Sequence, residues 1–227
     1  MHEFLDAIAP HPPGVDPVDD LLHERCYVVR AYRADDTTLI LRGALRDQKP
    51  PGLYIADDDE PLTVHHMVVD MTIRVPTLEI IDARAVLETH PHTACPRIED
   101  HYRNLIGLSI ARGYTHRVRE LFGGPRGCTH TTALLQAMAP VAIQCGWSMQ
   151  MLKAQEILAS GKDLPSEPSE ARKMAYKMNL NTCHIWDEDG DHVRRIEEGI
   201  PMEAPVWVEK RMAKLGRSTD EWQRKRI

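Results

Sequence analysis

A glycine-rich turn followed by a thiol and an imidazole is the part of the chain whose residue types and spacing most clearly suggest chemistry. Residues 122–135 read FGGPRGCTHTTALL, so Cys128 and His130 come directly before an apolar run. Thr129 is a good N-cap residue, which predicts that Cys128 lies at the N-terminal end of a helix. Unpaired N–H groups and the helix dipole stabilise negative charge at such a position. The alternative is a plain helix start with a small buried cysteine.

Two adjacent histidines form a second group of candidate residues. Residues 64–75 read VHHMVVDMTIRV, and this alternation is typical of a half-buried β-strand. His65 and Met67 then fall on one face of the strand, and His66 falls on the other. We expect these imidazoles to face Cys128 and His130 around a shared cavity, where groups that titrate near neutral pH can transfer protons.

The elements that must position these residues divide the chain into a β-rich half and a helical half. Strand patterns at 26–32, 37–43, 64–75 and 78–86 predict a mostly antiparallel meander, with a loop at 46–60. The expected helices are Pro96 to about 112, 115–121, 166–179 and Glu203 onward. A further long helix is expected to begin at Thr129, to be interrupted at Pro140, and to end at Gly161 or Pro165. An Asp-Gly hairpin with strands 181–186 and 192–196 comes before the tail helix. The predicted fold class is α+β, with an extended proline-rich arm at 1–20 and a single domain at 21–227.

Composition excludes several classes of function. The chain has 227 residues and a net charge of −6, and no basic cluster indicates a nucleic-acid partner. No apolar run approaches the roughly 18 residues of a membrane span, and the acidic, proline-rich start does not resemble a signal peptide. Five cysteines, an odd number, favour a reducing compartment. We therefore expect a soluble cytoplasmic protein; the proline-rich arm and charged terminal helix also make a homodimer plausible.

Several segments together resemble a bacterial family called domain of unknown function 2889. The resemblance covers about residues 25–195, and its most specific element is Gly-Cys-Thr-His at 127–130. The other matching segments are His65-His66-Met67, the Cys95-Pro96 helix entry, residues 105–108, Gly113, Val118-Arg119 and the rest of 123–135.

The layout of residues 65–143 is also similar to that of U-type iron–sulfur cluster scaffolds. This second resemblance implies a fold with a pocket between a strand end and two helix N-termini, lined by three cysteine ligands. Cys95 and Cys128 match two of those positions, whereas His65 or His66 replaces the first. Because clusters need soft thiolates, the change leaves two readings: a zinc site with mixed Cys and His ligands, or imidazoles that perform acid–base chemistry.

The residue set favours an enzyme without a cofactor, since no dinucleotide, P-loop or haem motif is present. We expect a carbon–carbon lyase of the retro-aldol type that acts on a small phenolic aromatic compound and releases formaldehyde. The first resemblance implies a role in the bacterial catabolism of aromatic compounds. In this hypothesis His65 or His66 is the base, His130 is the acid, and Cys128 with the helix N–H groups stabilises oxyanion charge. The remaining expected site residues are Tyr114 as a catalytic residue and Arg103, Arg126, His92, Met67 and Tyr102 as substrate contacts.

Two alternatives remain open from the sequence. One is a metal-binding or iron–sulfur carrier that uses Cys95, Cys128, His65 and His130 as ligands of zinc or a cluster. The other is an interaction domain without catalytic activity.

Overall fold

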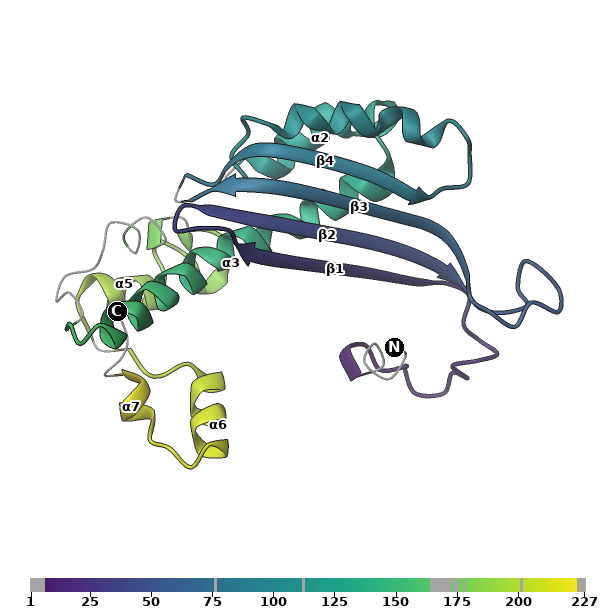
Figure 1. Cartoon of the computed structure of the whole chain (residues 1–227). Coiled ribbons are helices and arrows are strands. Elements are labelled where there is room, and N and C mark those ends of the chain that lie inside the picture. Colours follow the sequence, from purple (N-terminus) through teal and green to yellow (C-terminus); the bar gives the residue numbers. More distant parts are fainter. Residues whose placement is uncertain are drawn as a thin grey trace.

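A four-stranded antiparallel meander in the order β1-β2-β3-β4 forms the centre of the molecule (Figure 1). The computed structural model describes residues 7–75, 77–111, 113–163, 173, 176–177, 179–200 and 202–223. The strands are β1 (Glu24–Arg33), β2 (Thr38–Lys49), β3 (Leu62–Arg74) and β4 (Glu79–Thr89). Helices follow the sheet along the chain, so the predicted α+β class is confirmed.

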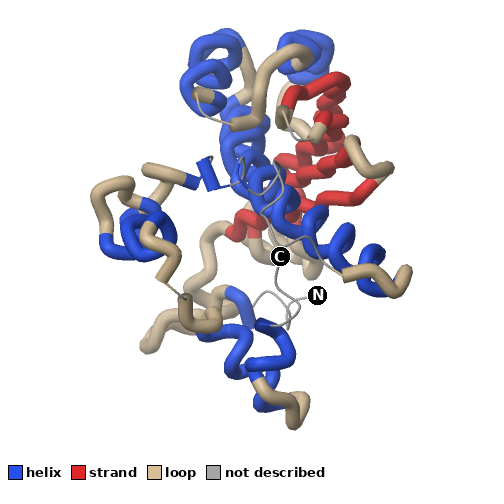
Figure 2. The backbone as a smooth tube through the Cα atoms, turned by 90° about the vertical axis from the view of Figure 1, so that its left-hand side faces the viewer, coloured by secondary structure: helices blue, strands red, loops and turns tan. Residues whose placement is uncertain are grey.

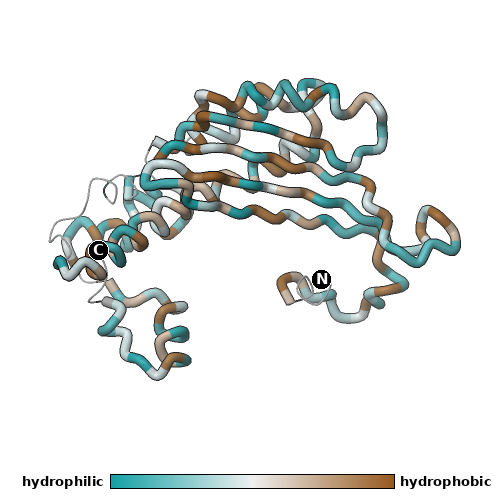
Figure 3. The backbone as a smooth tube through the Cα atoms, in the orientation of Figure 1, coloured by the Kyte–Doolittle hydropathy of each residue, from teal (hydrophilic) through white to brown (hydrophobic). Residues whose placement is uncertain are grey.

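Alternation along the strands separates a buried face of the sheet from an outer one. On β3, Met67, Val69, Met71 and Ile73 are buried, and the residues between them are more exposed. Figure 3 shows this as alternating hydrophobic and hydrophilic residues along the strands. Because side chains in a strand point alternately to its two faces, His65 lies on the same side as Met67 and His66 lies on the opposite side.

Strand β2 is longer than the sequence pattern predicts. Residues 46–49, expected in a loop, continue the strand, and Asp47 pairs in register with Arg25 of β1 and His65 of β3. The proline and glycine residues at 50–52 mask this extension, because they suggest that the chain has already turned. The correction matters because it brings a buried carboxylate into the sheet beside the predicted histidines.

The helices between residues 95 and 159 cover one face of the sheet, as the view in Figure 2 shows. The first, η1 (Cys95–Leu105), is a 3₁₀-helix, and it is shorter than the predicted helix to about 112. Gly107 has φ +87°, a left-handed conformation that ends the helix. The backbone then bonds to the start of β4, where Leu108 O accepts the N–H of Ile80 at 2.8 Å.

Two helices complete this layer. Helix α2 (Tyr114–Phe122) confirms the predicted short helix, and the turn η2 (Gly124–Arg126) leads into α3 (Thr129–Ala159). Pro140 lies inside α3 without ending it, and the helix stops at Ser160, before Gly161. The N-cap residue is Cys128 rather than Thr129, so the thiol belongs to the residue directly before the first turn of α3.

The C-terminal part departs from the predicted hairpin. The segments 181–186 and 192–196 form a short 3₁₀-helix, η3 (His184–Trp186), and a helix, α5 (Asp191–Glu197), not strands. Asp187 Oδ1 accepts the N–H of Asp189 at 3.1 Å, and this local turn directs the chain into α5. Within residues 202–223 the structure has two helices, α6 (Val206–Lys214) and α7 (Thr219–Gln223), where the sequence predicts one.

Two predicted segments lie partly or mostly outside the described residues. Most of the helix expected at 166–179 does so. Of the arm expected at 1–20, residues 7–20 are described and are exposed to solvent. Among the described helices, none combines the length and apolar composition that a membrane span requires.

Gly43 of β2 lies directly against Met138 of α3. A Cβ atom at this position would lie 2.6 Å from Sδ and 2.8 Å from Cγ of Met138. Gly43→Ala is therefore expected to lower the free energy of unfolding by about 1–3 kcal/mol, the usual cost of overpacking a core. Urea denaturation of the two proteins would measure the difference.

Gly146 provides the control, because it lies within α3 and a Cβ atom there would meet nothing within 4 Å. Gly146→Ala should leave stability unchanged or raise it by up to about 1 kcal/mol through helix propensity. Equal destabilisation by both substitutions would contradict the close approach at Gly43.

Candidate acid–base site

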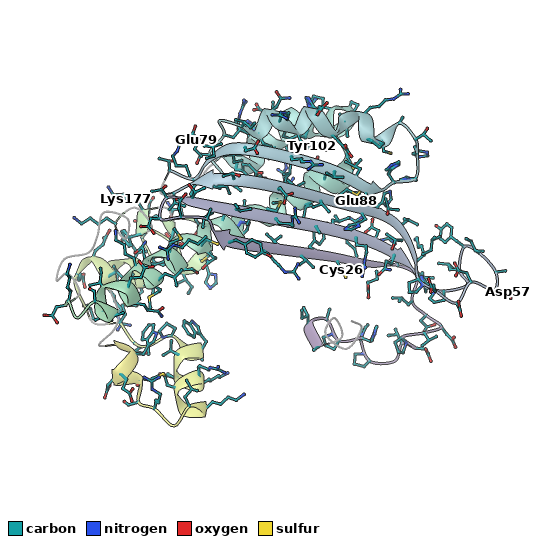
Figure 4. The ribbon with its side chains drawn as sticks, in the orientation of Figure 1. Cys26, Asp57, Glu79, Glu88, Tyr102 and Lys177 are labelled. Atoms are coloured by element: carbon teal, nitrogen blue, oxygen red, sulfur yellow. The ribbon has the colours of Figure 1, made fainter. Side chains whose placement is uncertain are left out.

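The candidate site lies at the end of the sheet where β1 and β3 begin and β2 and β4 end. In Figure 4, Cys26 near the start of β1 and Glu88 near the end of β4 mark this end. Asp47 is the central residue. Its side chain is only 1% exposed, because it continues the buried face of β2 after Leu45. A buried carboxylate requires partners that compensate for lost hydration, and the neighbouring strands supply them.

The strongest partner of Asp47 is Arg25. Its guanidinium donates two parallel hydrogen bonds, from Nε to Oδ1 at 2.5 Å and from Nη2 to Oδ2 at 2.7 Å. Burial raises the pKa of Asp47, but the hydrogen bonds and positive charge of Arg25 outweigh burial and lower the pKa below its ordinary value. Asp47 is therefore a carboxylate at neutral pH, and Arg25 holds it in a fixed orientation.

Three imidazoles surround this carboxylate. His65 Nδ1 lies 3.2 Å from Oδ2, His130 Nε2 lies 3.4 Å from Oδ2, and His23 Nε2 lies 3.4 Å from Oδ1. His65 comes from β3, His130 from the first turn of α3, and His23 directly precedes β1. The site thus joins residues that lie more than a hundred positions apart in the sequence.

His65 and His130 are in direct contact with each other. Their rings are stacked, with centroids 3.8 Å apart and ring planes inclined by 26°. Burial lowers the pKa of His130, and the neighbouring His65 lowers it further, against the opposing effect of Asp47. Two protonated imidazoles at this distance would repel each other, so simultaneous protonation of both rings is disfavoured.

Cys128 contacts the other ring nitrogen of His130. Its Sγ lies 3.7 Å from Nδ1, while Nε2 of the same ring faces Asp47. The phenol oxygen of Tyr102 accepts the N–H of Cys128 at 2.8 Å and so fixes the backbone just before α3. Burial raises the pKa of Tyr102, so this phenol remains neutral and acts as a structural support for the thiol.

The donors that could hold a metal ion are Asp47, His65 and His130, whose ligand atoms lie within 4.8 Å of one another. The geometry fits a shared ion poorly. A metal binds an imidazole nitrogen in the plane of its ring, and stacked rings do not direct their nitrogens to one point. The Arg25 guanidinium also donates a hydrogen bond to each carboxylate oxygen of Asp47, and its positive charge repels a metal cation there. The arrangement is better suited to proton transfer.

The structure separates several predicted site residues from this cluster. His66 lies on the opposite face of β3. Tyr114 is buried in the core, where burial raises its pKa and its hydroxyl has no hydrogen-bond partner among the described residues. Met67 is also a core residue, 1% exposed. None of these three side chains has a described contact with Asp47, His65 or His130.

The other predicted substrate or ligand residues have different structural surroundings. Arg126 donates hydrogen bonds to backbone oxygens of α2, from Nε to Glu120 O at 2.8 Å and from Nη2 to Arg119 O at 3.3 Å. It therefore caps the end of that helix, where cations are favourable. Arg103 and His92 are exposed. Cys95 is not part of the donor group found among the described residues.

Sequence reasoning missed Asp47, Arg25 and His23. Asp47 was assigned to a loop, although the alternation Leu39, Leu41, Gly43, Leu45 continues to it. An acidic residue at a core position of such a pattern signals a buried charge that needs a partner. Arg25 can be recognised only through the β1–β2 register, which the sequence pattern does not specify.

The lowered pKa of His130 predicts a pH-dependent stability. In the unfolded chain this imidazole binds a proton near pH 6.5. In the folded protein, burial and then the neighbouring His65 lower its pKa, against the opposing effect of Asp47. Protons therefore favour the unfolded state, and stability should fall as the pH decreases from about 6.5 through the lowered pKa. Thermal unfolding between pH 7.5 and 5 would measure this.

The variant His130→Asn separates this residue from other acid-sensitive groups. Its stability should change less over the same pH interval, because it lacks the titrating ring. An identical pH profile for the variant and the natural protein would show that His130 does not contribute.

Comparison with known proteins identifies the family and gives no relative of established function. No curated protein matches the chain, and no solved structure matches it; the resemblance to iron–sulfur scaffolds therefore stays a prediction. A family model with the description "Protein of unknown function (DUF2889)" matches residues 23–144, a range that contains His23, Arg25, Asp47, His65, Cys128 and His130. The chain belongs to the DUF2889 family.

Proposed function

We propose that the protein is a carbon–carbon lyase that works without a cofactor and releases formaldehyde from a phenolic aromatic compound by proton transfers. The observation that carries the proposal is the stacked pair of His65 and His130 on one buried carboxylate. A reaction of this type needs an acid and a base within reach of one substrate. Two imidazoles within reach of one substrate can supply both near neutral pH.

The lowered pKa of His130 decides which imidazole is the first base and which is the acid. Because the pKa of His130 is lowered, His130 is the neutral member and can accept a proton first. His65, whose Nδ1 lies 3.2 Å from the Asp47 carboxylate, is then assigned the role of the acid. The proposal thus exchanges the two starting roles that the sequence suggests, and it excludes His66 as the base because of its position on the outer face.

The proposed catalytic cycle returns both imidazoles to their starting protonation states. His130 takes the phenolic proton while His65 protonates the departing ether oxygen, which forms a quinone methide. His65, now neutral, then takes the proton of the hydroxymethyl group. The carbon–carbon bond breaks, formaldehyde leaves, and its bonding electrons restore the aromatic phenolate. His130 returns the proton to the phenolate, so each imidazole ends in the state in which it began.

Other groups at the site stabilise the charge that develops on oxygen. The N–H groups of the first turn of α3 have no intrahelical acceptor, and no side chain caps this helix. Together with the Cys128 thiol they favour a phenolate or alkoxide oxygen near the helix N-terminus. All five cysteines are free thiols, which supports the further proposal of a cytoplasmic location.

The test is formaldehyde release from a phenolic dimer that carries a benzylic ether and, on the adjacent carbon, a hydroxymethyl group. We expect one formaldehyde per substrate consumed, and no turnover of the same compound with its phenol converted to a methyl ether, because the ether has no proton for His130 to remove. Equal turnover of the two compounds, or no formaldehyde above the uncatalysed rate, would contradict the proposal.

A metal-dependent function is the second candidate, favoured by the convergence of Asp47, His65 and His130. Elemental analysis of protein purified without added metal tests it. A stoichiometric content of zinc or iron, retained after dialysis, would support this candidate and require the His65 and His130 rings to reorient.

A further inference from the structure

Cys128, His130 and Asp47 form a continuous path from a thiol through an imidazole to a buried carboxylate. The thiol lies 3.7 Å from Nδ1 of His130, and Nε2 of the same ring lies 3.4 Å from Asp47 Oδ2. Arg25 holds the carboxylate, and Tyr102 holds the backbone of Cys128. An imidazole placed between a thiol and an oriented carboxylate is the arrangement that converts a thiol into a nucleophile.

We propose that Cys128 is a nucleophile that attacks the carbonyl carbon of small activated esters or thioesters, with His130 as its base and Asp47 as the residue that orients His130. This activity goes beyond the proton transfers of the proposed lyase, in which no covalent bond to the protein forms. It does not depend on the lyase proposal, because it requires neither the phenolic substrate nor His65.

The position of Cys128 at the start of α3 selects the class of electrophile. When a thiolate attacks a carbonyl, the negative charge develops on the oxygen bonded to the attacked carbon, close to the sulfur. The uncapped N–H groups at the start of α3 lie next to Cys128 and can donate to that oxygen. In conjugate addition the charge develops several atoms away from the sulfur, beyond this helix end, so an acyl group fits better than an unsaturated ketone.

The chemical step balances without an added cofactor. The Cys128 thiol proton moves to His130 Nδ1 as the sulfur bonds to the carbonyl carbon. The carbonyl re-forms as the bond to the leaving group breaks, and His130 gives the proton to that group. Water then attacks the acyl-cysteine while His130 takes a proton from it. The carbon–sulfur bond breaks, and the thiol regains its proton.

The experiment treats the full chain with p-nitrophenyl acetate near pH 7 and locates the acetyl group by peptide mass spectrometry. Cys26 is a matched internal control, since it is partly buried like Cys128, but its thiol lies 3.6 Å from the Glu24 carboxylate, and burial and that charge raise its pKa. Cys183 is the exposed control. We expect Cys128 to be acetylated at least about tenfold faster than either control.

A positioning variant then tests the path through the imidazole. His130→Asn should slow acetylation of Cys128 by about tenfold or more and leave Cys183 unchanged, which also reports that the variant is folded and equally accessible to the reagent. Acetylation of Cys128 no faster than that of Cys183 in the natural protein would overturn the proposal without any variant. Formaldehyde release from the phenolic dimer is measured separately, so the two proposals succeed or fail independently.

Discussion

Asp47→Asn is expected to lower the free energy of unfolding by about 3 kcal/mol, which is near the lower end of the cost of breaking a buried ion pair. The substitution removes the negative charge that Arg25 contacts through two hydrogen bonds. The Arg25 side chain, which is 34% exposed, then faces a neutral amide. Because water still reaches part of this side chain, the loss of stability is limited. Chemical denaturation at pH 7 measures the difference.

The neighbouring pair of Arg42 and Asp70 provides a matched control. It also joins adjacent strands through two hydrogen bonds, at 2.6 and 2.8 Å, but it lies on the outer face of the sheet. Exposed pairs of this kind contribute about 1 kcal/mol or less, so Asp70→Asn should have a small effect. If the two variants lost equal stability, burial of Asp47 would not be the cause.

Replacing His65 with alanine should reduce the rate of formaldehyde release by about 100-fold or more, the usual contribution of a group that donates or accepts a proton in the transition state. His65 is required twice in the proposed cycle, first as the acid and then as the base. Because it lies on the site face of β3 at 3.2 Å from Asp47, its neighbours along the strand cannot take its place. Steady-state kinetics of the variant with the phenolic dimer would measure the loss.

The adjacent histidine makes this experiment specific. His66 follows His65 in the sequence but lies on the outer face of the strand, so His66→Ala should retain a turnover close to that of the natural protein. A large loss in His66→Ala together with a small loss in His65→Ala would place the reaction on the other side of the sheet.

The sequence predicts the meander well because strand alternation is a local property that each segment expresses by itself. It places His65 and Met67 on one face of β3, and the structure brings His65 together with His130 and Cys128. The shared cavity around these groups stays a prediction. The catalytic roles stay proposals, since the contact of two side chains does not establish a reaction.

The rest of the site depends on long-range register, which local patterns do not contain. Asp47 was missed because Pro50 and Gly52 suggest an early turn, and Arg25 was missed because only the pairing of β1 with β2 brings it to Asp47. Arg126 was assigned to substrate because of its charge, but it caps α2. The prediction of a C-terminal hairpin was wrong because an Asp-Gly turn can lead into a helix as well as into a strand.

The most direct test of the central claim is a pH titration of the ring nitrogens of His65 and His130 by NMR of protein labelled with ¹⁵N-histidine. If burial and the stacked His65 ring lower the pKa of His130, the His130 ring stays neutral to a lower pH than an isolated histidine does. The variants His65→Ala and His130→Asn assign the two sets of signals. Protonation of His130 at or above pH 6.5, the value for isolated histidine, would contradict the account of a buried, stacked imidazole in this site.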